Sequence, residues 1–348
     1  MIKRKKTKQI FVGNVPIGGN ADIAVQSMCN TPTWDVEKTV NQIKELEAAG
    51  CEIIRVAVPD KKSADALKEI KQNISIPLIA DIHFDYRLAL ASIENGVDAL
   101  RINPGNIGKE DFIRQVVEAA RKKHIPIRIG VNSGSLEKEF SHLEKVDAMV
   151  ASAMKNVEIL EKYDFDMIKI SLKASDVLTT IEAYEKISEK TDYPLHVGIT
   201  EAGTLKSGLI KSSIGIGAIL LKGIGDTIRV SLTAQPKEEV FAAYELLKSL
   251  KLRNRGVNLI SCPTCGRTKI NLIELAHKVE EIVAPINKPL TIAVMGCPVN
   301  GPGEAKGADI GIAGGIGEGY IFKKGEIIKK VPEQQLLDEF KKELNSMI

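Results

Sequence analysis

Short runs of β-branched and other apolar residues alternate with longer amphipathic stretches over the first two thirds of the chain. Such runs begin at positions 23, 52, 77, 99, 126, 167, 195 and 227. Between the first two runs lies "DVEKTVNQIKELEAAG", whose apolar residues recur at helical spacing: Val36, Val40, Ile43 and Leu46. Gly50 follows them and is placed to end the helix. Eight alternations of strand and helix predict a (β/α)8 TIM barrel of the α/β class.

The last hundred residues predict a second, smaller α/β domain. The helical stretch "KEEVFAAYELLKSL" would close the barrel, and "KLRNRG" is typical of a short polar linker. We therefore expect the barrel over residues 1–252 and the second domain over residues 257–348. Ahead of the first strand, "VGNVPIGG" is expected to form a hairpin on the barrel floor. An open doubly wound sheet is the alternative fold, but no glycine fingerprint follows the first strand.

The predicted mouth of the barrel is rich in cations. In such barrels the active-site side chains come from the carboxyl ends of the strands, where residues two apart face the same side. Five strands carry an arginine or lysine there and a sixth carries His83, and the residues so selected include Arg55, Arg101, Arg128, Asn132, Lys169, Lys173, Arg229 and Ser231. Because like charges in a partly desolvated cup repel one another, this pattern predicts an anionic substrate bearing phosphate or diphosphate. Asp81 and Asp85 would otherwise be internal counter-ions, and Lys169 lies deeper than Lys173 and fits a structural role.

A glutamate follows the seventh strand directly, in "ITEAG". Glu201 is placed to act as a general acid on a departing hydroxyl group. A salt bridge to one of the arginines explains the same residue equally well.

Three of the five cysteines gather in the last quarter of the chain. Cys262 and Cys265 form a C-x-x-C motif, and Cys297 follows within "MGCPVNGPGEA". A structural zinc site needs four ligands, and His277, inside a predicted helix, is expected to be a solvated surface residue. Three thiols without a fourth indicate a [4Fe–4S] cluster with one distinctive iron. Glu304 is then either a displaceable oxygen ligand of that iron or an ordinary loop carboxylate.

Composition and net charge limit the classes of binding partner and the compartment that the sequence predicts. The formal net charge of +3 is too balanced to indicate a nucleic-acid or membrane partner. The start "MIKRKKTK" lacks the apolar run of a signal peptide, so we expect a cytoplasmic protein whose first residues form a solvated tail. An odd number of cysteines in such a chain argues against a disulfide framework.

Taken together, these motifs resemble those of the (E)-4-hydroxy-3-methylbut-2-enyl diphosphate synthase family, iron–sulfur enzymes of the methylerythritol phosphate pathway, in its two-domain bacterial form. The resemblance extends over essentially the whole chain. It is based on "VQSM", "ADIHFDYRLAL", "RINPGN", "IRIGVNSGSLE", "GITEAG", "GIGDTIRVSLT", "SCPTCGR" and "MGCPVNGPGEA".

The resemblance implies a reductive ring opening and dehydroxylation of 2-C-methyl-D-erythritol 2,4-cyclodiphosphate. It implies that a [4Fe–4S] cluster is held by Cys262, Cys265, Cys297 and Glu304. It implies that the diphosphate is bound by Arg55, His83, Arg101, Arg128, Asn132, Lys173, Arg229 and Ser231. Glu201 would protonate the departing hydroxyl, and Asn300 would help to position the substrate or its loop at the cluster. The electron donor would be flavodoxin or ferredoxin, and a homodimer would place the cluster domain of one subunit over the barrel of the other.

Two other hypotheses use the same residues. A pterin-type transferase barrel with a zinc-bound tail would use the cationic mouth and transfer no electrons. A non-catalytic iron–sulfur redox sensor would use the cysteines but gives no reason for the cations at the strand ends.

Overall fold

The computed structural model describes residues 2–134, 136–297 and 305–348. The chain divides into two compact units, Met1–Arg253 and Asn254–Ile348. Each unit has hydrophobic clusters of its own. We call them the barrel unit and the C-terminal unit. Within the described residues, no helix is long and apolar enough to span a membrane.

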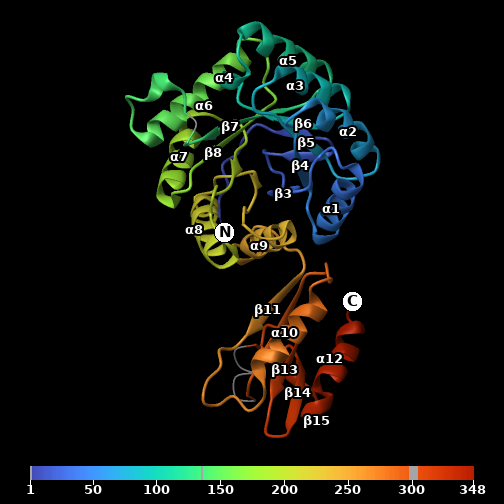
Figure 1. Cartoon of the computed structure of the whole chain (residues 1–348). Coiled ribbons are helices and arrows are strands. Elements are labelled where there is room, and N and C mark those ends of the chain that lie inside the picture. The colour runs from blue at the N-terminus through green and yellow to red at the C-terminus, as the bar shows by residue number, and fades with distance from the viewer. Residues whose placement is uncertain (1, 135, 298–304) are drawn as a thin grey trace. The chain divides into compact units, whose positions relative to one another are not determined.

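Eight parallel strands among the described residues form the barrel (Figure 1). Their hydrogen-bonded order is β8-β7-β6-β5-β4-β3-β10-β9, and a bridge between Ile170 and Leu195 closes the ring between β8 and β9. The (β/α)8 prediction is therefore confirmed, with all eight strands where the sequence places them. The strands are β3 (Ala24–Met28), β4 (Ile53–Ala57), β5 (Leu78–Asp81), β6 (Ala99–Ile102), β7 (Ile127–Asn132), β8 (Ile168–Lys173), β9 (His196–Val197) and β10 (Thr227–Ile228).

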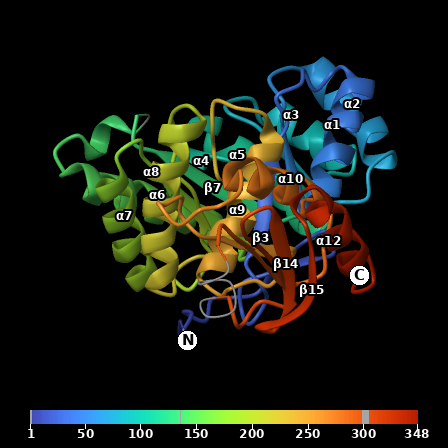
Figure 2. The ribbon, with the colours of Figure 1, turned by 90° about the horizontal axis from the view of Figure 1, so that it is seen from below.

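Helices surround these strands (Figure 1), and Figure 2 shows the same ribbon from below. They are α1 (Val36–Ala49), α2 (Lys61–Gln72), α3 (Tyr86–Glu94), α4 (Pro104–Ile107), α5 (Glu110–Lys122), α6 (Lys145–Glu161), α7 (Val177–Lys190), α8 (Leu205–Leu221) and α9 (Pro236–Ser249), with a short 3₁₀ turn, η1 (Lys138–Phe140). Helix α1 shows why the pattern folds this way. The Asp35 carboxylate accepts a hydrogen bond from the Lys38 N–H, and Gly50 ends the helix at φ 108°, a value that favours glycine. Its predicted apolar face packs into the barrel unit's core.

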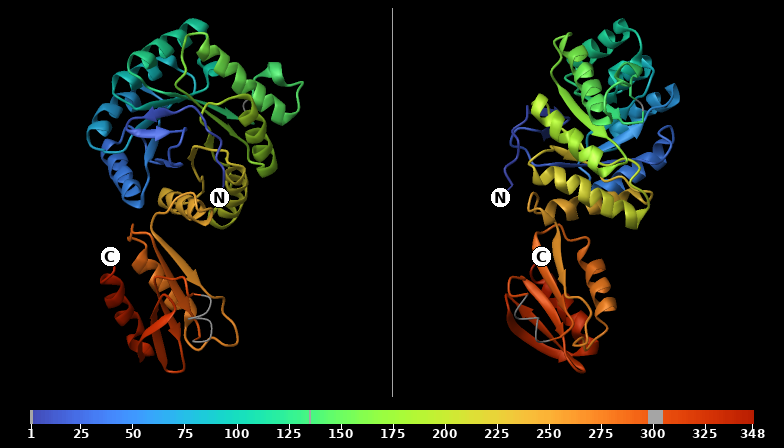
Figure 3. Two further views of the ribbon diagram at one scale, coloured as in Figure 1. Left: turned by 180° about the vertical axis from the view of Figure 1, so that it is seen from behind. Right: turned by 90° about the vertical axis from the view of Figure 1, so that its left-hand side faces the viewer.

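A hairpin closes the amino-terminal end of the barrel (Figure 3). Its antiparallel strands, β1 (Ile10–Val12) and β2 (Val15–Ile17), turn Ile10, Val12 and Ile17 inward. These side chains pack against residues near the starts of four barrel strands, namely Ala24, Ile53, Ile79 and Ala99. The predicted hairpin on the barrel floor is confirmed.

The basic start of the chain is anchored, so the expectation of a solvated tail is wrong. Arg4 forms an ion pair with the buried Asp226, with 3.2 Å between Nη2 and Oδ1. The Lys5 N–H donates to the carbonyl of Gly223 at 2.8 Å, and the Thr7 hydroxyl donates to Asp226 at 3.0 Å. The buried carboxylate of Asp226 requires charged and hydrogen-bonding partners, and the start of the chain supplies them. The composition of that start does not show that Asp226 lies beside it.

Among its described residues, the C-terminal unit is a five-stranded sheet with two helices packed on it. Strands β11, β12 and β13 are parallel, whereas β14 and β15 continue the sheet antiparallel. This confirms the smaller α/β fold that the sequence predicts. Its elements are β11 (Val257–Ser261), α10 (Leu272–Val283), β12 (Leu290–Met295), β13 (Ile310–Gly314), β14 (Glu318–Lys323), β15 (Glu326–Pro332), η2 (Glu333–Gln335) and α12 (Leu336–Asn345).

Candidate active site

The carboxyl ends of the barrel strands bring five cations into one mouth. In the strand register Arg101 lies opposite Arg128, and Asn132 lies opposite Lys173. Four of the five cations are at least nine-tenths buried, although arginine and lysine are rarely so. We call the five side chains the cationic cup: Arg55, Arg101, Arg128, Lys173 and Arg229.

Burial and mutual repulsion make the cup electrostatically expensive. Burial lowers the pKa of the Arg55 guanidinium to about 10. Burial, together with the charges of neighbouring cup members, also holds the pKa values of Arg128 and Lys173 well below their usual range. Arg128 Nε and Nη1 have no hydrogen-bond partner among the described residues. A bound anion would supply the missing acceptors and neutralise the repulsion.

Two buried carboxylates offset part of this charge. Asp81 lies 3.5 Å from Arg55 Nε and 3.3 Å from Arg101 Nη1. Burial raises the pKa of Asp81, but the nearby Arg55 and Arg101 charges outweigh that effect and leave the pKa below its usual value. Glu239, on α9, lies 3.5 Å from Arg229 Nε. Two carboxylates do not balance five cations, so the cup keeps a net positive charge.

The prediction of internal counter-ions is right for Asp81 and wrong for Asp85. Asp85 caps the amino end of α3 and pairs with Arg87 at 2.8 Å. A residue one position before a helix is placed to bind backbone N–H groups, which explains the difference.

Two glycines leave room for the cations. A side chain at Gly130 would collide with the Arg101 guanidinium, whose Nη2 donates to the Gly130 carbonyl at 3.1 Å. A Cβ at Gly198 would lie 2.6 Å from the Arg229 carbonyl oxygen and 3.0 Å from Lys173 Nζ. A glycine inside a strand often marks such a close approach, so "RIGV" and "HVGI" carried a signal that sequence reasoning left unused.

The other predicted mouth residues are more exposed. His83 Nε2 lies 3.7 Å from Asp81 Oδ1, with 57% of the side chain exposed. Asn132 is the last residue of β7 and is half-buried. Ser231 follows the end of β10 by three residues and is also half-buried. Glu201 is exposed, and its φ of 52° is unusual for a residue with a side chain. Such backbone strain is concentrated at functional sites.

Sequence reasoning also missed two side chains, among the described residues, that contact the cup. The Met28 sulfur accepts hydrogen bonds from Arg55 Nη2 at 2.9 Å and from Arg229 Nη1 at 3.5 Å. A thioether is a weak acceptor, so these donors remain available to an anion. Glu239 is the second residue, and its signal was an acidic position on the buried face of α9.

The cysteine motifs follow two adjacent parallel strands of the C-terminal unit. Cys262 follows β11 and Cys297 follows β12, so both lie at the carboxyl edge of the sheet. The Gly296 N–H donates to Cys262 Sγ at 3.2 Å, and the Lys269 N–H donates to the Gly296 carbonyl at 3.0 Å. These bonds hold the two loops together. Backbone hydrogen bonding from Arg267 is the main cause that lowers the pKa of the exposed Cys265 thiol.

The cysteine thiols and the N–H groups beside them suit an iron–sulfur cluster. Thiolates are the usual ligands of such a cluster, and N–H groups that donate to sulfur commonly tune it. Within the described residues no three cysteine, histidine or carboxylate groups converge closely enough to hold a metal. Asn300 and Glu304 lie outside the described residues. His277 is a surface residue, with 71% of its side chain exposed, as expected.

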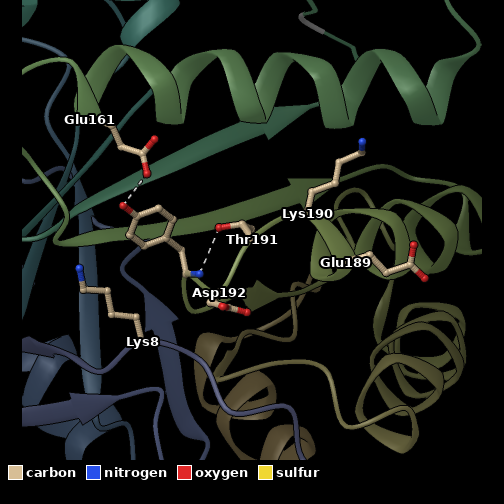
Figure 4. A pocket seen from close by; sticks show the side chains of 7 residues that line it. Lys8, Glu161, Glu189, Lys190, Thr191 and Asp192 are labelled. Atoms are coloured by element: carbon tan, nitrogen blue, oxygen red, sulfur yellow. Dashed lines mark hydrogen bonds between the residues drawn. The ribbon is translucent and has the colours of Figure 1, made fainter.

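A separate hollow of about 340 Å³ lies before β9, on the amino-terminal side of the barrel (Figure 4). There the Tyr193 hydroxyl donates to Glu161 at 2.8 Å, and the Tyr193 N–H donates to the Thr191 hydroxyl at 3.2 Å. Its charged residues have both signs, and it is at the opposite end of the strands from the cationic cup. We assign it no function.

Comparisons with known proteins cover both units. The model of the GcpE TIM-barrel domain matches residues 7–244, and that of the GcpE protein C-terminal domain matches residues 258–346. A 4-hydroxy-3-methylbut-2-en-1-yl diphosphate synthase (flavodoxin) from Caldanaerobacter subterraneus is 63% identical, over 100% of this chain and 99% of that protein. The enzymes of the same name from Geobacillus thermodenitrificans and Dehalococcoides mccartyi are each 57% identical over 100% of this chain and cover 94% and 100% of those proteins.

Solved structures of another enzyme share the barrel. Dihydropteroate synthase from Stenotrophomonas maltophilia superposes with a TM-score of 0.53 at 15% identity, covering 70% of this chain and 97% of that one. The Xanthomonas albilineans enzyme gives a TM-score of 0.51 at 14% identity, covering 70% of this chain and 97% of that one. Identities this low show a common fold alone.

Proposed function

The chain belongs to the GcpE family of 4-hydroxy-3-methylbut-2-en-1-yl diphosphate synthases, and on that basis we propose that it converts 2-C-methyl-D-erythritol 2,4-cyclodiphosphate to (E)-4-hydroxy-3-methylbut-2-enyl diphosphate. The observation that supports this most strongly is the cationic cup. Five converging cations with two carboxylates fit a diphosphate far better than they fit a neutral ligand.

The cup would hold the diphosphate and orient the ring. Arg128 lies opposite Arg101 in the strand register, and its Nε and Nη1 have no partner among the described residues, so it would bind a phosphate directly. The bidentate geometry of a guanidinium suits phosphate oxygens. The residues proposed to bind the diphosphate are Arg55, His83, Arg101, Arg128, Asn132, Lys173, Arg229 and Ser231.

Cys262, Cys265, Cys297 and Glu304 would hold a [4Fe–4S] cluster, with Glu304 as an oxygen ligand. When bound, the cluster supplies the two electrons that the reaction consumes. The tertiary carbon–oxygen bond of the ring breaks and leaves its electron pair on the diphosphate oxygen, while a hydroxyl group leaves with one proton as water. Two electrons and one proton are therefore consumed for each water released. Glu201 would hold the proton for the departing hydroxyl, and Asn300 would position the substrate or its loop.

Flavodoxin is the electron donor that we propose, because the relatives carry it in their names. Ferredoxin is the alternative.

We also propose a homodimer in which the cluster domain of one subunit covers the barrel of the other. An apolar surface on the barrel unit supports association: Leu205, Ile210, Ile214 and Leu221 on α8 and Phe241 on α9 are all more than a third exposed. An exposed apolar patch of this kind is typical of a subunit interface.

The pterin-type transferase is a weaker account. Dihydropteroate synthases share the barrel fold, but their similarity covers the barrel and gives no reason for the paired cysteine loops of the C-terminal unit.

The test is metal content and turnover of protein purified without oxygen. We expect about four irons per chain, matching sulfide, a brown absorbance and turnover of the cyclic diphosphate. Cys297→Ser should lose iron and colour, whereas Cys51→Ala, in the barrel unit, should keep both. Stoichiometric zinc with no colour and no turnover would exclude the reductive reaction.

A further inference from the structure

The segment that carries Arg229 and Ser231 has little backbone support. Strand β10 ends at Ile228, after two residues, so both side chains lie beyond it. The Arg229 N–H donates to the Val197 carbonyl at 3.0 Å, and the next backbone anchor is the Thr233 N–H, which donates to Gly203 at 2.9 Å. Arg229 and Ser231, which we propose bind the diphosphate, therefore depend on side-chain contacts for their orientation.

Glu239 supplies those contacts from the helix behind the segment. Its Oε1 accepts a hydrogen bond from the Leu232 N–H at 2.9 Å, directly after Ser231. Its Oε2 lies 3.5 Å from both Nε and Nη2 of Arg229. The same oxygen accepts a 3.4 Å hydrogen bond from the buried Ser27 hydroxyl on β3. One carboxylate thus joins β3, α9 and the segment after β10.

Glu239 is buried, which is unusual for a carboxylate whose only role is to stabilise the fold. Glu239 is 4% exposed on the buried face of α9, beside Val240 and Ala243. A buried carboxylate costs free energy unless charged and hydrogen-bonding partners repay it, and replacing both members of a buried ion pair with apolar residues is often neutral or stabilising. A role beyond packing would explain a carboxylate at this position.

We propose that Glu239 is a positioning residue for diphosphate binding, because it orients the Arg229 guanidinium and fixes the backbone at Ser231. It acts through those residues and does not touch the substrate. This inference rests on the proposed function, in which Arg229 and Ser231 bind the diphosphate.

The sign of the effect separates positioning from simple electrostatics. Removing a negative charge from beside a cationic cup raises the local potential, which by itself tightens the binding of an anion. Loss of a positioning contact has the opposite effect, because the guanidinium must be ordered when the anion binds.

The experiment compares Glu239→Gln with Glu238→Gln in the full chain. Glu238 is the exposed neighbour on the same helix, so its variant has the same change in net charge. The probe is inorganic pyrophosphate, titrated by calorimetry. We expect E239Q to bind it about tenfold more weakly and E238Q to bind it like the wild type. In turnover of the cyclic diphosphate, E239Q should raise KM about as much and leave kcat within about twofold.

A double-mutant cycle tests the route. In an Arg229→Met background, E239Q should have a much smaller effect on pyrophosphate affinity, since the residue through which it acts is gone. Binding by E239Q that is tighter than or equal to that of the wild type would overturn the proposal, and so would an undiminished effect in the R229M background. If E239Q lacks the wild-type circular dichroism spectrum, Glu239→Asp replaces it in the same cycle, with weaker binding again expected. The pyrophosphate data stand even if the wild type fails to turn over the cyclic diphosphate, so failure of the proposed function is seen separately.

Discussion

Lys169 shows at the scale of one residue what the barrel interior does to a charge. The side chain is 2% exposed, opposite Arg128 in the strand register, and its Nζ has no hydrogen-bond partner among the described residues. Burial, reinforced by the charge of Arg128, lowers its pKa to about 7, and Asp226 only partly opposes this. An unfolded chain would restore a pKa of about 10.4. Between these values the unfolded state binds a proton that the folded state does not, so the free energy of unfolding rises with pH in that window.

We predict that Lys169→Met raises Tm at pH 7 and that this gain shrinks by pH 9. At pH 7 the wild type bears almost the whole cost of burying the lysine, and that cost falls by roughly 1.4 kcal/mol per pH unit. Calorimetry of both proteins at the two pH values measures the difference. The exposed Lys237→Met is the control, with no such trend expected. A gain that does not change with pH would contradict the explanation.

Arg128 should show a trade between stability and binding. Replacing it with Met removes a buried cation that is repelled by its neighbours, so Tm should rise. Because Arg128 Nε and Nη1 have no partner among the described residues and would bind an anion, pyrophosphate binding should weaken about tenfold or more. Calorimetric titration and thermal unfolding measure the two effects, with the surface variant Arg114→Met as the control. Unchanged pyrophosphate affinity would remove Arg128 from the proposed site.

At the scale of elements, the hairpin of β1 and β2 closes the amino-terminal end of the barrel. Ile17 is fully buried among the starts of the strands, whereas Phe11, on the same hairpin, is 55% exposed. We predict that Ile17→Ala lowers the free energy of unfolding by about 2–5 kcal/mol, because it leaves a cavity in a closed end of the barrel. Phe11→Ala should cost less than about 1 kcal/mol. Urea unfolding of the two variants measures both, and equal losses would mean that the hairpin does not plug the floor.

At the scale of the whole molecule, the two units have separate cores. We predict that a chain ending at Arg253 folds and binds pyrophosphate with near wild-type affinity, because the cup lies entirely in the barrel unit. Circular dichroism and calorimetric titration test this. A fragment that is unfolded or does not bind would show that the barrel requires the C-terminal unit.

Association is a second property at this scale. Ile214 is 56% exposed on the apolar surface of α8. We predict that Ile214→Asp converts the proposed dimer to a monomer in sedimentation velocity, since a charge in an apolar interface is left unpaired. Phe11→Asp, on the barrel floor, should leave the dimer intact. A dimer that survives I214D would place the interface elsewhere.

The sequence by itself determined the architecture and the kinds of chemistry. Hydrophobic periodicity is local, so it located all eight barrel strands and the face of α1 that enters the core. The alternation of residues along a strand likewise identified which side chains face inward at Arg101, Arg128 and Lys173. The spacing of Cys262, Cys265 and Cys297 predicted their iron–sulfur chemistry.

Only the tertiary structure decided how those groups are held. That Glu239 orients Arg229, that Met28 lies between two guanidiniums, and that Asp226 anchors the start of the chain are contacts between residues up to 222 positions apart. Such contacts depend on how strands and helices pack, which a linear pattern does not specify. The pKa of a charged group also depends on the tertiary structure, because burial and the neighbours that the fold brings together determine it.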